Sequence, residues 1–84
     1  MANVEMYVKT TCPYCVRASQ LLAKKGIKAT EYRVDAGGPL KEQMVQRSGR
    51  MTVPQIFIDG RHVGGCDDLF ALERAGRLDA MLAA

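Results

Sequence analysis

The chain of 84 residues has no tryptophan, one histidine and only three cysteines. Three cysteines cannot all pair within one chain, and they are too few for a small secreted fold that depends on disulfides. No apolar run precedes Lys9, so we expect no signal peptide. No stretch approaches the roughly 20 apolar residues that a membrane-spanning helix needs. We therefore expect a protein of a reducing compartment, the cytoplasm, that does not bind membranes.

A large excess of charge of one sign is also missing. Twelve Lys and Arg stand against nine Asp and Glu, which gives a formal net charge of +3. Such scattered charge does not indicate nucleic-acid binding, although it favours a small anionic ligand. Hydrophobic residues make up 48% of the chain and charged residues 25%, which is ordinary for a soluble globular domain. The length fits one domain over residues 1–84, which we expect to be a monomer.

Turn signals and hydrophobic periodicity divide the chain into four strands and three helices. The predicted strands cover residues 4–8, 29–34, 55–59 and 61–65, and the helices begin near Pro13, near Pro39 and after an N-cap at Asp67. Asp59-Gly60 is a strong hairpin signal between the last two strands. Residues 78–84 should form a short helix or a frayed tail. The order β-α-β-α-β-β-α predicts an α/β fold, a four-stranded mixed sheet flanked by three helices.

Two of the cysteines lie in "CPYC", residues 12–15. Cysteines at this spacing can form a reversible disulfide, hold half of a metal site or attach a haem. Haem attachment needs a histidine directly after the second cysteine, and Val16 stands there instead. Structural zinc needs four ligands, for which the candidates are Cys12, Cys15, His62 and Cys66. We expect no metal site, because predicted sheet and helix separate the two halves of this set, but zinc stays open as an alternative.

A redox role fits the surroundings of the pair, because a CxxC beside a β-α-β pattern is typical of thioredoxin-like proteins. Unpaired N–H groups and the positive end of the dipole at a helix start favour a thiolate on Cys12, and Lys9 adds positive charge. Cys15 lies one turn inside the helix, where fewer donors are free. We therefore expect Cys12 to attack a disulfide and Cys15 to resolve the resulting mixed disulfide.

Three motifs together resemble the dithiol glutaredoxins of the bacterial type: "CPYC" at 12–15, "TVP" at 52–54 and "GGCDD" at 64–68. The resemblance implies the thioredoxin fold and glutathione-dependent reduction of protein disulfides and glutathione mixed disulfides. Glutathione is then a co-substrate, and no cofactor is tightly bound. Thioredoxins usually carry Trp-Cys-Gly-Pro-Cys, which this tryptophan-free chain lacks. Related proteins with Cys-Gly-Phe-Ser carry a glutathione-ligated iron–sulfur cluster, an alternative that Pro13 argues against.

The resemblance also implies a glutathione site. A cis Val53–Pro54 bond would present the Val53 backbone to the cysteine of glutathione, like a short added strand. The γ-glutamyl carboxylate would bind the N–H groups of Cys66 and Asp67, and the γ-glutamyl amine would bind the Asp67 carboxylate. Tyr14 could form a wall of the groove. The expected contacts are Lys9, Tyr14, Thr52, Val53, Pro54, Gly65, Cys66 and Asp67.

Five residues have weaker interpretations. We expect Lys9 to bind the glycyl carboxylate of glutathione, with Arg50 and Arg47 as weaker candidates that belong on a solvated helix face. Cys66 is expected to be a small buried side chain rather than a third redox thiol. His62 is expected to be an exposed hairpin residue.

Overall fold

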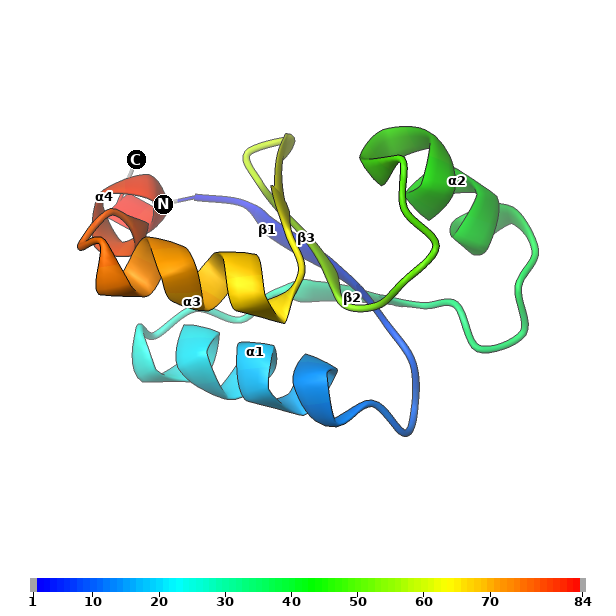
Figure 1. Ribbon diagram of the computed structural model, residues 1–84, viewed down its shortest axis with the longest axis horizontal. Coiled ribbons are helices and arrows are strands. Elements are labelled where there is room, and N and C mark those ends of the chain that lie inside the picture. The colour runs from blue at the N-terminus through cyan, green and yellow to red at the C-terminus, as the bar shows by residue number, and fades with distance from the viewer. Residues whose placement is uncertain (1, 84) are drawn as a thin grey trace.

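The computed structural model describes residues 2–83, which form four strands and four helices (Figure 1). In chain order these are β1 (Val4–Val8), α1 (Pro13–Lys24), β2 (Thr30–Arg33), α2 (Pro39–Ser48), β3 (Gln55–Ile58), β4 (Arg61–Gly64), α3 (Cys66–Arg74) and α4 (Leu78–Ala83). The predicted order is confirmed. The structure adds α4, so the helical alternative for the tail is correct; residue 84 lies outside the described residues.

The strands form one mixed sheet in the order β2-β1-β3-β4. β1 pairs with β2 in parallel, and the pairs β1–β3 and β3–β4 are antiparallel. The hairpin between β3 and β4 turns at Asp59 and Gly60, whose φ angles of 52° and 80° suit a tight two-residue turn. The mixed sheet that the sequence predicted is thus confirmed, with the parallel pair formed through the α1 crossover.

One face of the sheet, which we call the α1/α3 face, carries the main hydrophobic core. In Figure 1, α1 and α3 lie side by side along it, next to α4. The buried cluster contains thirteen residues: Val4, Met6, Val8, Cys15, Ala18, Leu21, Leu22, Ile56, Ile58, Cys66, Leu69, Leu78 and Leu82. Because side chains alternate along a strand, residues 4, 6 and 8 of β1 face these helices. Cys12 and Cys15 lie at the start of α1, where they contact this core.

The opposite face, which we call the α2 face, has a smaller core. Its buried cluster consists of Tyr7, Val34, Met44 and Phe57. The Tyr7 and Phe57 rings meet edge to face, with centroids 5.9 Å apart. Val53 packs against both clusters, so the loop before β3 lies where the two faces meet.

Within residues 2–83, every helix is too short or too polar to cross a membrane.

Candidate functional site

Cys12 lies where the chain enters α1. Pro13 takes the first helical position, where a fixed φ suits the helix and a missing N–H has no cost. Cys12 is therefore the N-cap residue, with extended backbone (φ −134°, ψ 100°), and its Sγ accepts a hydrogen bond from the Cys15 N–H at 3.2 Å. The sulfur thus satisfies an N–H group that every helix leaves free at its start. The predicted position of Cys12 at a helix start is confirmed.

Cys15 has very different surroundings. Cys12 is half-buried, whereas Cys15 is only 5% exposed and packs in the core of the α1/α3 face. Burial, followed by the hydrogen bond with Cys12, raises the pKa of the Cys15 thiol to about 12. Cys15 therefore keeps its proton through the physiological pH range.

The loop before β3 faces Cys12. The Val53–Pro54 peptide bond is cis, as the family resemblance implied. Pro54 is buried, Val53 is half-buried and Thr52 is exposed. The Cys12 thiol lies near the Val53 carbonyl oxygen, with Sγ and O 4.0 Å apart. The Val53 backbone therefore flanks the Cys12 sulfur.

The start of α3 corrects one prediction. Gly65 is the N-cap residue, not Asp67, because the helix already begins at Cys66. The Asp68 carboxylate accepts a hydrogen bond from the Gly65 N–H at 2.9 Å, and this bond holds the pKa of Asp68 below its usual range. Gly64 has a φ of 123°, and a Cβ there would overlap the Asp68 carboxylate. Asp67 is exposed and takes no part in this cap.

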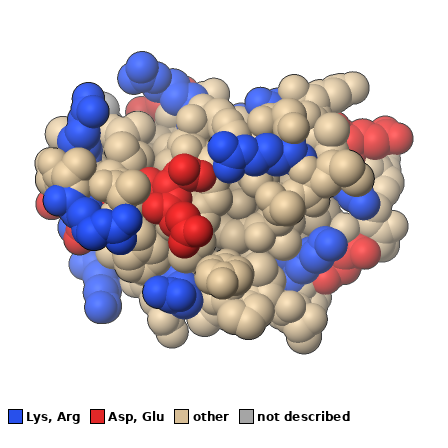
Figure 2. Space-filling model, viewed as in Figure 1, with Lys and Arg blue, Asp and Glu red and all other residues tan. Residues whose placement is uncertain are grey.

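A pocket of about 210 Å³ lies between the start of α1, the cis-proline loop and the start of α3. Its lining is Tyr14, Arg50, Thr52, Val53, Pro54, Gln55, Gly65, Cys66, Asp67 and Asp68. Seven of the eight predicted glutathione contacts are in this set. The exception is Lys9, which lines a separate groove with Cys15 and Arg33. Figure 2 shows acidic and basic side chains next to each other near the start of α3.

The structure corrects the placement of Arg47 on a solvated helix face. Arg47 extends from α2 over the sheet, and its guanidinium donates to both Glu5 carboxylate oxygens at 3.1 and 3.2 Å. It also lies 3.9 Å from the centroid of the Phe57 ring. Arg47 is therefore half-buried and lies outside the pocket.

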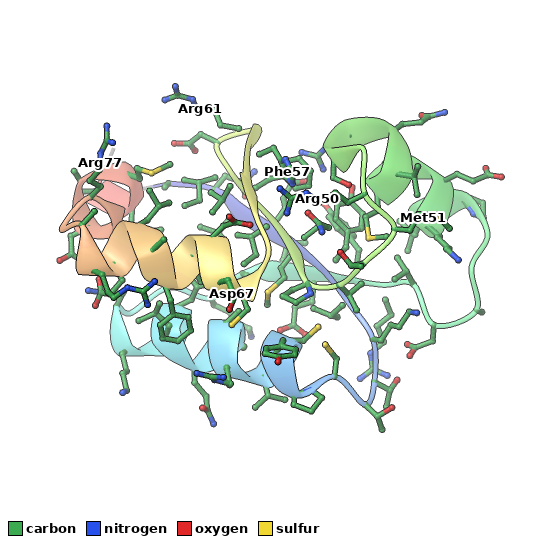
Figure 3. The ribbon with its side chains drawn as sticks, viewed as in Figure 1. Arg50, Met51, Phe57, Arg61, Asp67 and Arg77 are labelled. Atoms are coloured by element: carbon green, nitrogen blue, oxygen red, sulfur yellow. The ribbon has the colours of Figure 1, made fainter. Side chains whose placement is uncertain are left out.

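Arg50 follows α2 and is half exposed, and unlike Arg47 it lines the pocket. Its Nη1 donates to Asp68 at 3.2 Å, which links the loop to the start of α3. Figure 3 shows Arg50 and Met51 on the chain after α2, with Asp67 at the start of α3.

Sequence reasoning assigned no role to Gln55. Among residues 2–83, Gln55 alone is both polar or charged and buried, with 1% of its surface exposed. Its side chain bonds to Thr52 and to His62. The available signal was a glutamine at the start of the otherwise apolar stretch "QIFI".

The remaining cysteine and the histidine lie as expected. Cys66 is 5% exposed and packs in the core of the α1/α3 face, where burial raises the pKa of its thiol. His62 is exposed on β4. In the part of the chain that the structure describes, no three His, Cys, Asp or Glu side chains come together in a way that could hold a metal ion.

A dithiol at a helix start, a cis-proline loop against its first sulfur and this mixed sheet define a thiol–disulfide oxidoreductase of the thioredoxin fold. The family model described as Glutaredoxin matches residues 4–63. The chain is 57% identical over 82 residues to Glutaredoxin 3 of Escherichia coli (strain K12), a match that covers 98% of this chain and 99% of that relative. The chain belongs to the glutaredoxin family, and its function is glutathione-dependent thiol–disulfide exchange.

Solved structures agree with this assignment. The solution structure of a glutaredoxin from Brucella melitensis is similar with a TM-score of 0.84 at 52% identity, covering 98% of this chain and 89% of that one. The crystal structure of a buckwheat glutaredoxin–glutathione complex has a TM-score of 0.88 at 32% identity, covering 98% of this chain and 77% of that one. The thioredoxin fold predicted from the sequence is confirmed.

Proposed function

We propose that the protein reduces protein disulfides and glutathione mixed disulfides with Cys12 as the attacking thiolate and Cys15 as the resolving thiol. The asymmetry of the pair carries this assignment of roles. The Cys12 sulfur is half-buried at the helix start and accepts the Cys15 N–H at 3.2 Å, whereas Cys15 is 5% exposed. Because the thiolate is the nucleophile and must reach its target, Cys12 suits attack.

A glutathionylated client needs only Cys12. The Cys12 thiolate attacks the glutathione sulfur, the client–glutathione bond breaks, and the client leaves as a thiolate. The thiolate of a second glutathione then attacks the glutathione sulfur held on Cys12. Oxidised glutathione is released, and the Cys12 thiolate is restored.

A protein disulfide needs both thiols. Cys12 attacks one client sulfur, and the other client sulfur leaves as a thiolate. Cys15 then loses its proton to solvent and attacks the Cys12 sulfur, which expels the client and leaves a Cys12–Cys15 disulfide. Two glutathiones reduce this disulfide and become oxidised glutathione. The bond with Cys12 and its charge contribute to the high pKa of Cys15, so forming the mixed disulfide removes part of the barrier to deprotonating Cys15.

We place glutathione in the pocket beside Cys12. Its cysteine would pair with the Val53 backbone, and its γ-glutamyl carboxylate would bind the first N–H groups of α3, at Cys66 and Asp67. The exposed Asp67 carboxylate would bind the γ-glutamyl amine. Two observations support this placement: these residues line one pocket, and the buckwheat relative is a glutathione complex.

The glycyl carboxylate of glutathione needs a cation, and the pocket favours Arg50 over Lys9. Arg50 lines the pocket, while Lys9 lines the neighbouring groove. We expect Arg50→Met to raise the KM for glutathione more than Lys9→Met does. The reverse order would return this role to Lys9.

We infer that the protein works as a monomer in the cytoplasm on disulfide-containing or glutathionylated clients. A glutathione-dependent cycle needs a compartment that keeps glutathione reduced. Recognition through the Val53 backbone, rather than through side chains, suits a carrier that serves several clients.

Cysteine variants test the assigned roles in an assay coupled to glutathione reductase, run on a small glutathione mixed disulfide and on a protein disulfide. Cys12→Ser should abolish both activities. Cys15→Ser should keep much of the first and lose most of the second, because an intramolecular thiol can act at effective concentrations of ~10⁵ M or more. Cys66→Ser is the matched control and should change neither. If folded Cys15→Ser loses both activities, the roles are wrong.

A second experiment measures the two thiols directly. Iodoacetamide alkylation followed by peptide mapping should modify Cys12 much faster than Cys15 from pH 6 to pH 9, because the pKa of Cys15 is raised to about 12. Equal reactivity of the two cysteines at pH 6 would contradict the proposal.

A further inference from the structure

A chain of hydrogen bonds leads from an exposed strand to the glutathione pocket. Gln55 begins β3 directly after Pro54, and it is 1% exposed. Its Nε2 donates to the Thr52 carbonyl oxygen at 3.0 Å and to Thr52 Oγ1 at 3.2 Å. On its other side, Gln55 Oε1 lies 2.7 Å from His62 Nε2. The thiol chemistry proposed above makes no use of this chain.

Elementary chemistry sets the direction of each bond. A backbone carbonyl can only accept, so the Gln55 atom that faces the Thr52 carbonyl is the amide nitrogen. Oε1 then faces His62, whose Nε2 must carry the hydrogen and donate it. Burial, then the positive charge of Arg50, lower the pKa of His62, which agrees with a neutral ring at physiological pH.

The last link in the chain is the Thr52 hydroxyl. Its oxygen accepts from Gln55, so its own hydrogen points elsewhere. Thr52 is exposed and lines the pocket. The hydroxyl hydrogen is therefore available to an acceptor in the pocket, such as a carbonyl or carboxylate oxygen of a peptide.

The loop that carries Thr52 has few other restraints. Residues 50–54 form neither helix nor strand, and Pro54 has no N–H to donate. The Arg50 N–H bonds to Ser48 Oγ at 3.0 Å, which holds the far end of the loop. At the near end, Gln55 bonds to Thr52. Thr52 directly precedes Val53, and the Val53 carbonyl lies beside the Cys12 sulfur.

We propose that Gln55 is a positioning residue for glutathione. Oriented by His62, it holds the Thr52 carbonyl in place and turns the Thr52 hydroxyl to donate a hydrogen bond to bound glutathione. The proposal rests on the glutathione site described above. Without Gln55, the loop would have to become ordered when glutathione binds, and that cost weakens binding of substrate and transition state equally. KM should then rise while kcat stays unchanged.

Gln55→Met tests this, because methionine fills a similar volume without hydrogen bonds. We expect the KM for glutathione to rise by about five- to tenfold, or about 1–1.4 kcal/mol. The kcat at saturating glutathione should stay within about twofold of wild type, since Cys12 and Cys15 are untouched. Arg61→Ala, in the strand that carries His62 and outside the pocket, is the matched control and should leave KM unchanged.

A double-mutant cycle shows whether Gln55 acts through Thr52. Thr52→Val should also raise KM, and the double variant should raise KM by clearly less than the product of the two single effects, because both single variants remove the bond between Gln55 and the Thr52 hydroxyl. Thr52→Ser, which keeps the hydroxyl, should restore a KM near that of wild type. If the two effects multiply, Gln55 does not act through Thr52 and the proposal is overturned.

Further variants keep the test decisive. An unchanged KM in folded Gln55→Met overturns the proposal. If Gln55→Met does not fold, His62→Phe takes its place, because the exposed ring can keep its contact with Phe57 while losing the donor; a KM rise of about twofold supports the proposal, and no rise overturns it. A wild-type protein whose activity does not depend on glutathione would instead contradict the proposed function itself.

Discussion

The two faces of the sheet are held together in different ways. The α1/α3 face buries thirteen apolar residues in one cluster, among them Cys15 and Cys66. The α2 face buries four, and around them it places the Glu5–Arg47 ion pair and the Gln55 amide. Apolar burial is strong but non-directional, whereas hydrogen bonds fix geometry. The comparison indicates that the α1/α3 face supplies most of the stability, while the α2 face sets the position of the loop to which we propose glutathione binds.

The largest effect should come from the apolar face. Leu69 on α3 is 0% exposed, and Leu69→Ala should lower the free energy of unfolding by about 2–5 kcal/mol, because it removes buried methyl groups and leaves a cavity. Met44 is equally buried, but its cluster is smaller and can collapse more easily around a gap. Met44→Ala should therefore cost less. Urea unfolding of both variants measures the difference. Equal losses in the free energy of unfolding would contradict the view that the α1/α3 face supplies most of the stability.

A polar deletion on the α2 face should come next. Arg47→Met keeps the packing over Phe57 but leaves the Glu5 carboxylate, which is 17% exposed, without its cationic partner, so that the Tyr32 hydroxyl is its remaining donor. We expect a loss of about 1.5–3 kcal/mol, the usual range for hydrogen bonds to a charged group. Adding Glu5→Gln should recover part of this loss because the unpaired charge disappears. Unfolding of both single variants and the double variant gives the coupling between them; a coupling of zero would show that the ion pair does not stabilise this face.

The same pair should appear in the acid dependence of stability. The hydrogen bonds from Arg47 hold the pKa of Glu5 below its usual range. A carboxyl with a depressed folded pKa stabilises the fold above its unfolded pKa, and that contribution is lost as the pH falls through the folded pKa. Between pH 5 and pH 2, wild type should lose stability more steeply than Glu5→Gln. Parallel curves in thermal unfolding would contradict the assignment.

The smallest effect on stability is expected where α3 meets the pocket. Asp67 is not the cap of α3, so Asp67→Ala should cost less than about 0.5 kcal/mol. Asp68→Ala removes the bond to the Gly65 N–H and should cost about 1 kcal/mol. Asp67→Ala should nevertheless raise the KM for glutathione, because it removes the expected partner of the γ-glutamyl amine. If melting temperature falls and KM does not, Asp67 is only structural.

Local features were predictable from the sequence. Proline at a helix start, Asp59-Gly60 at a hairpin and alternation in "VEMYV" each act over a few residues, so the elements and the sheet follow from them. The N-cap of α3 was misplaced because Gly65 and Asp67 are both acceptable caps, and only the observed helix start distinguishes them.

Contacts between distant residues could not be predicted in this way. Arg47 was expected on a solvated helix face. It instead binds Glu5 on β1, which lies 42 positions away in the sequence. Gln55 reaches His62 only because the hairpin sets those two residues near each other. Periodicity describes one element at a time, and these pairs depend on how two elements meet. The cis bond was implied by the family resemblance alone.

The Cys12 sulfur, which we propose attacks disulfides, is also the cap of α1. A thiolate is a stronger acceptor for the Cys15 N–H than the neutral sulfur of a mixed disulfide. The start of the helix is therefore held more firmly when Cys12 is a thiolate than when it is part of a mixed disulfide. Coupling free energies are reciprocal. If the free thiolate stabilises the start of the helix, the folded helix stabilises the free thiolate by the same free energy. In the proposed cycle, the step in which glutathione restores the Cys12 thiolate is therefore also the step that strengthens the cap of α1.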